Sequence, residues 1–299
     1  MPTLLEQSIF RILAYTKYTE FSLTTFEVWK WCDIGAVTIF EIDSCLNESQ
    51  WLRNNGVSGF SGFWAIGNVD GWRHERISRV TDALRKSRRA KAFATFASWL
   101  PWVQMIAVCN SLAFSFTKET SDIDLFVVTK PGRIWSTRLV LTGVLALLRL
   151  RPGETVRDPM CLSFFVDTNH LDLASLKIGS EDPYLQMWIA SLSPIMDRDD
   201  VLLKLRAVNR WIRPLLPRSY RVQRASAYVV AGNRSLPDIR MLEPIAERIQ
   251  RARFPVALRQ LMNQDTRVVV TDGMLKFHEN DRRQAVSDAW RAECQKAGI

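Results

Sequence analysis

Cysteine and histidine are scarce in this chain of 299 residues, which has five of the first and three of the second. The cysteines are Cys32, Cys45, Cys109, Cys161 and Cys294. Their odd number and scattered, mostly apolar surroundings are typical of small buried side chains in a reducing compartment, not of a disulfide framework. His74, His170 and His278 show no metal-ligand spacing with one another or with the cysteines, so the sequence indicates no zinc site.

Long apolar runs are also lacking. Residues 93–108 are interrupted by Pro101, and residues 134–150 by Arg138 and Arg149. Neither stretch supplies the ~20 uninterrupted apolar residues that span a bilayer. The first residues hold no basic segment followed by an apolar core, so we expect no signal peptide. These absences predict a cytoplasmic protein that does not enter a membrane.

The composition is that of a globular protein, with 47% hydrophobic and 24% charged residues. A chain of this length is expected to hold about two or three modules. The net charge of +9 is unevenly spread: residues 1–72 hold four basic and eight acidic residues, whereas residues 73–91 hold eight basic and two acidic ones. The basic surface is therefore expected in the middle and C-terminal parts of the chain.

A short motif in the middle of the chain points to chemistry. The apolar stretch 102–108 leads to Asn110-Ser111, and Asp122 and Asp124 then flank Ile123 in a second apolar stretch. Side chains of a strand alternate between its two faces, so both carboxylates are expected to point the same way. Two parallel carboxylates repel each other unless a cation lies between them, and Mg²⁺ prefers such oxygen ligands together with substrate phosphates.

This motif resembles that of the nucleotidyltransferase superfamily, which includes DNA polymerase beta, the CCA-adding enzymes and the aminoglycoside nucleotidyltransferases. Their signature is Gly-Ser, a loop, and then Asp-x-Asp within an apolar strand. The resemblance covers residues from about 100 to 170 and implies a nucleotidyltransferase domain over residues 101–180, of α+β class with a mixed sheet. It implies that Asp122 and Asp124 are the catalytic ligands of Mg²⁺, or of Mn²⁺. The nucleoside triphosphate, such as ATP, would contact Asn110, Ser111, Lys118 and Ser121.

The sequence departs from that signature at two places. Asn110 stands where the family has glycine, and asparagine is the next most tolerant residue for φ > 0. The family also has a third carboxylate on a neighbouring strand, and the candidate strand here is 160–166. Position within that strand selects Ser163, which cannot act as a carboxylate. Asp158 and Asp167, just outside the strand, are the alternative third-acid positions.

The flanking regions are predicted from periodicity and turn signals. Residues 1–72 read as three helices and a hairpin, a winged-helix-like module with Thr24 capping its second helix. Because the module is acidic, we expect it to bind a protein partner and not DNA. Residues 73–100 read as one basic connecting helix. Residues 181–299 read as a mainly helical region with a linker at 221–240, a hairpin near 267–278 and a surface position for His278.

A basic stripe runs along the connecting helix at helical spacing and is a candidate surface for nucleic acid. Its members are Arg73, Arg76, Arg85, Arg88 and Arg89.

Two functions remain open at this point. The first is a magnesium-dependent nucleotidyltransferase that moves a nucleoside monophosphate from a triphosphate to an acidic or polynucleotide acceptor such as RNA or tRNA. The alternative is a catalytically inactive protein of the same fold, acting as a nucleotide-binding or scaffold subunit.

Overall fold

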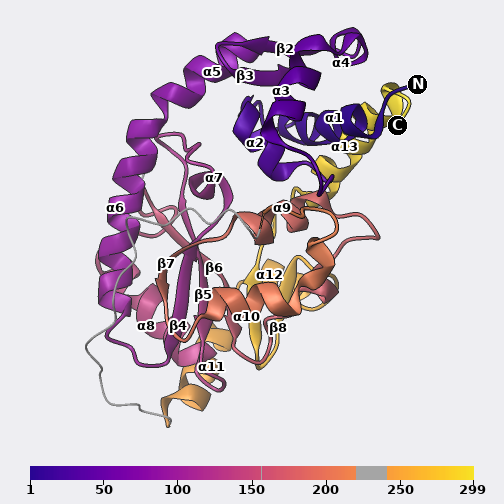
Figure 1. The fold of residues 1–299 in the computed structure, drawn as a ribbon. Helices are drawn as coiled ribbons and strands as arrows, with labels where there is room; N and C mark the ends of the chain where they lie inside the picture. The colour runs from indigo at the N-terminus through magenta and orange to yellow at the C-terminus, as the bar shows by residue number, and fades with distance from the viewer. Residues whose placement is uncertain (156, 220–240) are drawn as a thin grey trace.

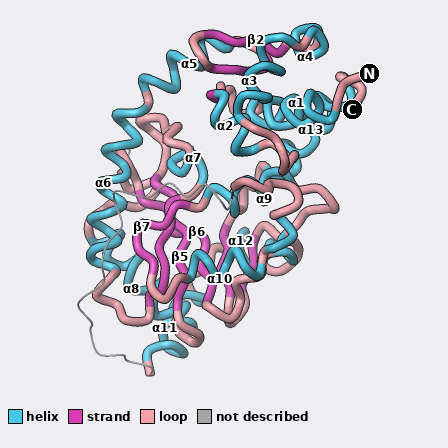
Figure 2. Tube along the Cα trace, in the orientation of Figure 1, coloured by secondary structure: helices cyan, strands magenta, loops and turns pink. Residues whose placement is uncertain are grey.

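A six-stranded mixed sheet lies at the centre of the protein (Figure 2). The computed structural model describes residues 1–155, 157–219 and 241–299, so the linker predicted at 221–240 lies outside the described residues. The strand order is β7-β4-β5-β6-β9-β8. β5 and β6 are parallel, and every other neighbouring pair is antiparallel. The predicted α+β class with a mixed sheet is confirmed.

The strands follow the apolar runs of the sequence. They are β4 (Val103–Val108), β5 (Ile123–Thr129), β6 (Met160–Asp167), β7 (Ser193–Asp197), β8 (Val268–Val270) and β9 (Met274–Phe277). Alternate residues of these strands enter two hydrophobic clusters, one on each face of the sheet. On one face lie α6 (Val80–Ala97), α8 (Ile134–Leu147), α11 (Leu242–Ala252) and α12 (Val256–Leu261). On the other lie α9 (Pro183–Ser191), α10 (Val201–Val208) and the N-terminal module.

The N-terminal module has its own small sheet, of order β1-β3-β2. Its elements are α1 (Leu4–Lys17), β1 (Leu23–Thr24), α2 (Thr25–Trp31), α3 (Ile39–Glu48), α4 (Gln50–Asn54), β2 (Val57–Phe60) and β3 (Phe63–Ile66). Threonine caps α1, α2 and α3, each time in a capping box with a glutamate three residues on. The predicted cap at Thr24 and the predicted hairpin are both confirmed.

The basic connecting segment is two helices and not the single helix predicted over 73–100. α5 (Val69–Ser78) ends and α6 begins at Arg79, whose ψ of −9° departs from helical geometry. The Arg79 side chain turns inward, pairs with Glu75 and lies over the Phe116 ring. α6 then runs along the edge of the molecule from the N-terminal module to the central sheet (Figure 1).

The central sheet includes strands from beyond residue 180, where the nucleotidyltransferase domain was expected to end. β7 pairs with β4, and the hairpin β8–β9 pairs with β6, so both come from the region predicted to be mainly helical. The hairpin itself was predicted, whereas β7 was not. Pro194 and Asp197 are residue types typical of turns, so the sequence of β7 does not indicate a strand. An edge strand tolerates proline because one side of its backbone needs no hydrogen-bond partner.

The last helix packs against the first, so the two ends of the chain lie side by side (Figure 1). In α13 (Arg283–Lys296), Trp290 Nε1 donates to the Arg11 carbonyl at 3.0 Å, and Glu293 pairs with Lys17 at 2.7 Å. The short helices are α7 (Asn110–Ala113), η1 (Ala174–Leu176) and η2 (Arg210–Ile212). None of the described helices combines the length and the apolar character needed to cross a membrane.

Candidate functional site

The turn after β4 has the backbone conformation that the motif predicts. Asn110 begins α7 with φ of +53°, in the left-handed region that glycine and asparagine tolerate best. Its side-chain amide hydrogen-bonds Asp124, and its Oδ1 accepts a hydrogen bond from the Tyr184 hydroxyl at 3.3 Å. Asparagine therefore supplies both the φ angle and a polar contact with the motif carboxylate.

Pairing of β4 with β5 brings Asp124 beside this turn. The backbone N–H of Cys109 donates to the Asp124 carbonyl at 3.2 Å. Burial raises the pKa of Asp124 to about 6, and the nearby Asp122 adds to the rise while Asn110 opposes it. Burial also raises the pKa of Asp122, against the opposing charge of Lys86. The structure thus brings Asn110, Asp122 and Asp124 together, with two acids close enough to destabilise each other's charge.

Lys86 is a site residue that sequence reasoning missed. Its side chain is fully buried, and Nζ lies 2.6 Å from the Ser121 carbonyl and 2.9 Å from Ser121 Oγ. It also donates to the Lys118 carbonyl, so this one ammonium group fixes the loop that leads to Asp122. Burial lowers the pKa of Lys86, against the attraction of Asp158.

A pattern in the sequence identifies the buried face on which Lys86 lies. Lys86 falls on the apolar stripe of α6 with Ala83, Ala90, Ala94 and Ala97, at helical spacing. A lysine inside such a stripe is expected to be buried with partners. The surrounding run of basic residues hid this signal.

The loop residues predicted to bind nucleotide have different surroundings. Ser121 Oγ donates to the Lys118 carbonyl at 2.8 Å, so Ser121 orders the loop at the entry to β5. The Lys118 side chain is exposed, and only its carbonyl takes part in the Lys86 contacts. Ser111 is half-buried on α7 next to Asn110 and accepts the Phe116 N–H through its carbonyl at 2.9 Å.

Asp158, one of the predicted third-acid positions, is paired with basic side chains of α6. It is buried, and its carboxylate accepts from Arg85 at 2.9 Å and from Arg89 at 3.1 Å, with Lys86 Nζ at 3.8 Å. Burial raises the pKa of Asp158, but the hydrogen bonds from the two arginines outweigh it and hold the pKa below its usual value. Asp158 is therefore the counter-ion of the connecting helix.

Asp167 lies at the wrong end of β6. It pairs with Thr129, five residues beyond Asp124 along β5, or roughly 16 Å at the rise of a strand. Its carboxylate accepts from the Asn169 N–H at 2.9 Å and contacts His170 Nδ1 at 2.7 Å. These contacts order the turn after β6, remote from the motif.

The residue opposite Asp124 is Cys161 and not Ser163. The register of the β5–β6 pair is irregular between Asp124 and Phe126, beyond the Asp124–Cys161 pair, and Ser163 lies two residues further along β6. Cys161 hydrogen-bonds both Asp124 and Ser163, and burial raises its pKa to about 12. Ser163 Oγ in turn lies 3.0 Å from His278 Nε2.

His278 is not the surface histidine that was predicted. Its ring packs edge-on to Phe164, with ring centroids 6.1 Å apart, and burial lowers its pKa to about 3, with Lys276 adding to the effect. It is therefore neutral at pH 7.

No group of three or more His, Cys, Asp and Glu side chains in the described part of the chain is arranged to hold a metal ion. The donor set at the motif is instead two carboxylates, and burial raises the pKa of both. This set suits Mg²⁺, which binds through one or two carboxylates and completes its octahedron with substrate phosphates and water.

Most of the predicted basic stripe is already paired within the protein. Arg76 contacts Glu27 at 2.6 Å, Arg73 contacts Asp70 at 3.2 Å, and Arg85 and Arg89 both contact Asp158. Arg88 is the exposed member of the stripe. These pairs leave less positive charge for a polyanion than the sequence suggests.

No family model, curated protein or solved structure matches this chain.

Proposed function

We propose that this protein is a nucleotidyltransferase that binds a nucleoside triphosphate at Asp122 and Asp124 and transfers its nucleoside monophosphate to an acceptor. The observation that carries the proposal is the contact of Asn110, at positive φ, with the buried carboxylate of Asp124, beside Asp122. The nucleotidyltransferase motif that the sequence resembles has such a turn next to two acids, and burial here raises the pKa of both acids.

The two carboxylates would hold Mg²⁺ or Mn²⁺ between them and the triphosphate. When bound, the metal would neutralise charge that develops on the phosphate oxygens. The protein's own residues position the parts: Lys86 fixes the loop before Asp122, and Asn110 orients Asp124. Ser111, the next residue of the turn, is placed to contact the phosphates. Positioning and charge compensation supply most of the catalysis in phosphoryl chemistry.

A second candidate is a nucleotide-binding or scaffold protein of the same fold without catalytic activity. It is favoured by the third-acid position, where the described residues offer Cys161 and Ser163 and where Asp158 is held by arginines. A thiol with a raised pKa and a serine cannot replace a carboxylate base.

We infer that the N-terminal elements form a winged-helix-like module that contacts protein and not nucleic acid. Its third helix carries Glu41, Asp43 and Glu48, and Phe40 beside them is 80% exposed. An acidic face with a projecting aromatic ring suits a protein surface better than a phosphate backbone.

Calorimetric titration with Mg²⁺ and each nucleoside triphosphate tests the binding step. We expect metal-dependent binding to the wild type and none to Asp122→Asn/Asp124→Asn. The matched control is Asp199→Asn/Asp272→Asn, which changes two exposed aspartates away from the motif and should bind like wild type. Equal binding to both double variants would refute the proposed site.

Release of pyrophosphate from the bound triphosphate, measured with a panel of acceptors, separates the two candidates. Turnover supports the transferase, and metal-dependent binding without turnover supports the nucleotide-binding protein. The panel includes RNA, because an acidic or polynucleotide acceptor was expected from the basic stripe. Binding of such an acceptor would depend on arginines that are exposed, Arg88 among them, because the other arginines of the stripe are paired within the protein.

A further inference from the structure

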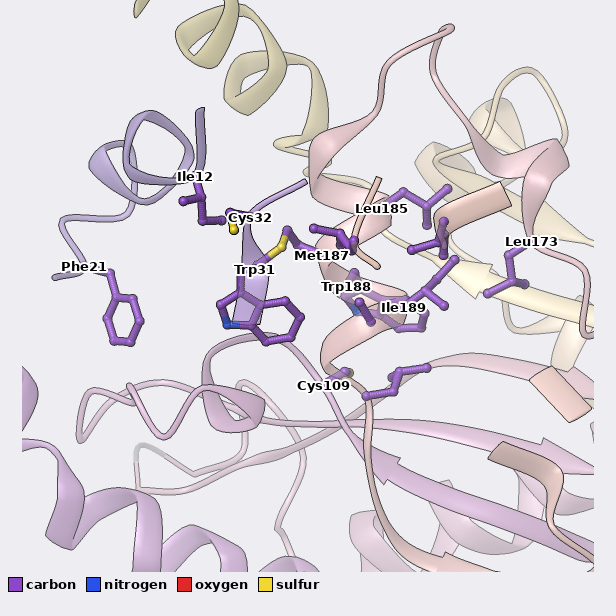
Figure 3. Packing of buried hydrophobic residues seen from close by; sticks show 14 of the residues in the cluster. Ile12, Phe21, Trp31, Cys32, Cys109, Leu173, Leu185, Met187, Trp188 and Ile189 are labelled. Atoms are coloured by element: carbon purple, nitrogen blue, oxygen red, sulfur yellow. The ribbon is translucent and has the colours of Figure 1, made fainter. Parts of the chain in front are cut away.

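A pocket of about 160 Å³ lies between the N-terminal module and α9, directly beside Asn110 and Ser111. Its walls come from three parts of the chain: Phe21 and Trp31 from the module, Phe114 and Phe116 from the segment after α7, and Tyr184 and Trp188 from α9. Figure 3 shows Trp31 reaching across toward Met187 of α9, with Trp188 over Cys109 at the base. The module thus completes a space that Asn110 and Ser111 of the motif help to line.

The lining of the pocket favours an uncharged ligand group. The lining residues that the structure describes include no Asp, Glu, Lys, Arg or His. The hydroxyls of Thr16, Thr19 and Ser191 donate to carbonyls of their own helical segments, at 3.2, 3.0 and 3.2 Å. A phosphate would be left without a counter-charge here. Along the walls away from Asn110, Ser111 and the two tyrosines, the polar edge of a nucleobase would also lose hydrogen bonds to water that these committed hydroxyls do not replace.

The size and shape of the walls favour a single planar ring. A cavity of this volume with an apolar lining holds about one benzene-sized molecule. Aromatic walls bind such a ring by edge-to-face and offset-stacked contacts.

The walls are held in place without a ligand. The Phe21 and Phe116 ring centroids are 4.7 Å apart, and those of Trp31 and Phe114 are 6.1 Å apart. Arg76 lies over Phe21, with its guanidinium carbon 4.4 Å from the ring centroid, and Arg79 lies over Phe116 at 4.0 Å. These basic residues of the connecting helices therefore support a pocket wall through cation–π contacts. A preformed apolar pocket next to polar groups is typical of a small-molecule site.

We propose that this pocket binds the uncharged aromatic ring of the acceptor and directs its hydroxyl toward Asn110, Ser111 and Asp124. The identity of the ligand as an acceptor rests on the proposed nucleotidyl transfer. In that reaction the acceptor oxygen bonds to the α-phosphorus as the bond from that phosphorus to the bridging oxygen breaks. Pyrophosphate leaves with the electron pair, and the hydroxyl proton passes to water.

The test is a ligand-observed NMR titration, without metal or triphosphate, with benzyl alcohol, benzoate and adenosine. Benzyl alcohol and benzoate share a ring and differ in charge. We expect benzyl alcohol to bind the wild type at least tenfold more tightly than benzoate, and adenosine not to displace it. Absence of benzyl alcohol binding, or equal binding of benzoate, would overturn the uncharged-ring site. Displacement by adenosine would overturn the assignment to the acceptor.

Two variants locate the binding. Thr19→Phe adds a ring at the pocket lining from an exposed position, and Ser191→Leu adds bulk from α9; each should weaken benzyl alcohol binding at least tenfold. The control is Thr95→Phe, because Thr95 is an exposed threonine whose hydroxyl also donates to a local carbonyl, that of Lys91 at 2.9 Å. If both lining variants bind like the control, the ring site lies elsewhere and the proposal fails. Because no triphosphate is present, failure of the proposed transferase leaves this result unaffected.

Discussion

Cys161 on β6 lies directly opposite Asp124 on β5 and hydrogen-bonds it, so a thiol occupies the position from which a carboxylate would complete a three-acid site. Cys161→Asp should convert the pair of acids into a triad. We expect Mn²⁺, measured by calorimetry, to bind this variant about tenfold more tightly than the wild type, because each added carboxylate strengthens a hard-cation site.

Ser163→Asp is the matched control for that change. Its new carboxylate would replace the hydroxyl that contacts His278 Nε2 and would not lie opposite Asp124. We expect a smaller gain in Mn²⁺ affinity than for Cys161→Asp. If Ser163→Asp gained more Mn²⁺ affinity than Cys161→Asp, the strand register would not determine where the metal binds.

Asp124→Asn should stabilise the protein at neutral pH. Because the pKa of Asp124 is raised from 3.8 to about 6, the folded state holds its proton to higher pH than the unfolded state, and stability falls as pH rises through this window. The free energy of unfolding of Asp124→Asn should exceed that of the wild type by about 1 to 3 kcal/mol at pH 7.5 and by little at pH 4. Urea unfolding at both pH values measures this difference in the free energy of unfolding, with Asp272→Asn as the control at an exposed position. A pH-independent difference would count against burial as the cause.

The positive φ of Asn110 predicts an unusual order of substitutions. Asn110→Gly should keep the free energy of unfolding within about 1 kcal/mol of the wild type, whereas Asn110→Val should lose about 2 kcal/mol or more, since a β-branched residue is strained in the left-handed region. Thermal unfolding of both variants provides the comparison. Equal Tm values would mean that this turn relaxes to another conformation.

Asp158→Asn should destabilise the fold and expose positive charge. Removing this buried carboxylate leaves Lys86 buried without its counter-ion, takes this partner from Arg89 and leaves Arg85 with Asp82 alone, at a cost of about 3 kcal/mol. The same variant should bind fluorescein-labelled oligo(U) more tightly than the wild type in an anisotropy titration. Asp70→Asn, which removes the exposed partner of Arg73, should cost less than about 1 kcal/mol. Tight oligo(U) binding by the wild type itself would instead support the prediction that the basic stripe binds nucleic acid.

Local signals in the sequence predict much of this fold. β4, β5 and β6 are apolar runs between breaking residues, the threonine caps are followed by glutamate at the right spacing, and Asp272-Gly273 marks the β8–β9 turn. The motif also places Asn110 near Asp124, because a strand, a turn and a returning strand suffice to do so.

What could not be predicted depends on contacts between distant segments. β7 forms only by pairing with β4, and the position of Cys161 opposite Asp124 is set by the register of the β5–β6 pair. The burial of Lys86 depends on the carbonyls of a loop more than thirty residues away. In each case tertiary pairing overrides the local pattern.

The packing of α13 on α1 has a consequence for how the protein is made. The Trp290 indole and the Arg11 carbonyl that it contacts are 279 positions apart in the chain. The N-terminal module is therefore translated long before α13, and the flank of α1 that α13 covers stays uncovered until α13 has been made. Nascent chains that stall before α13 would present that flank to chaperones.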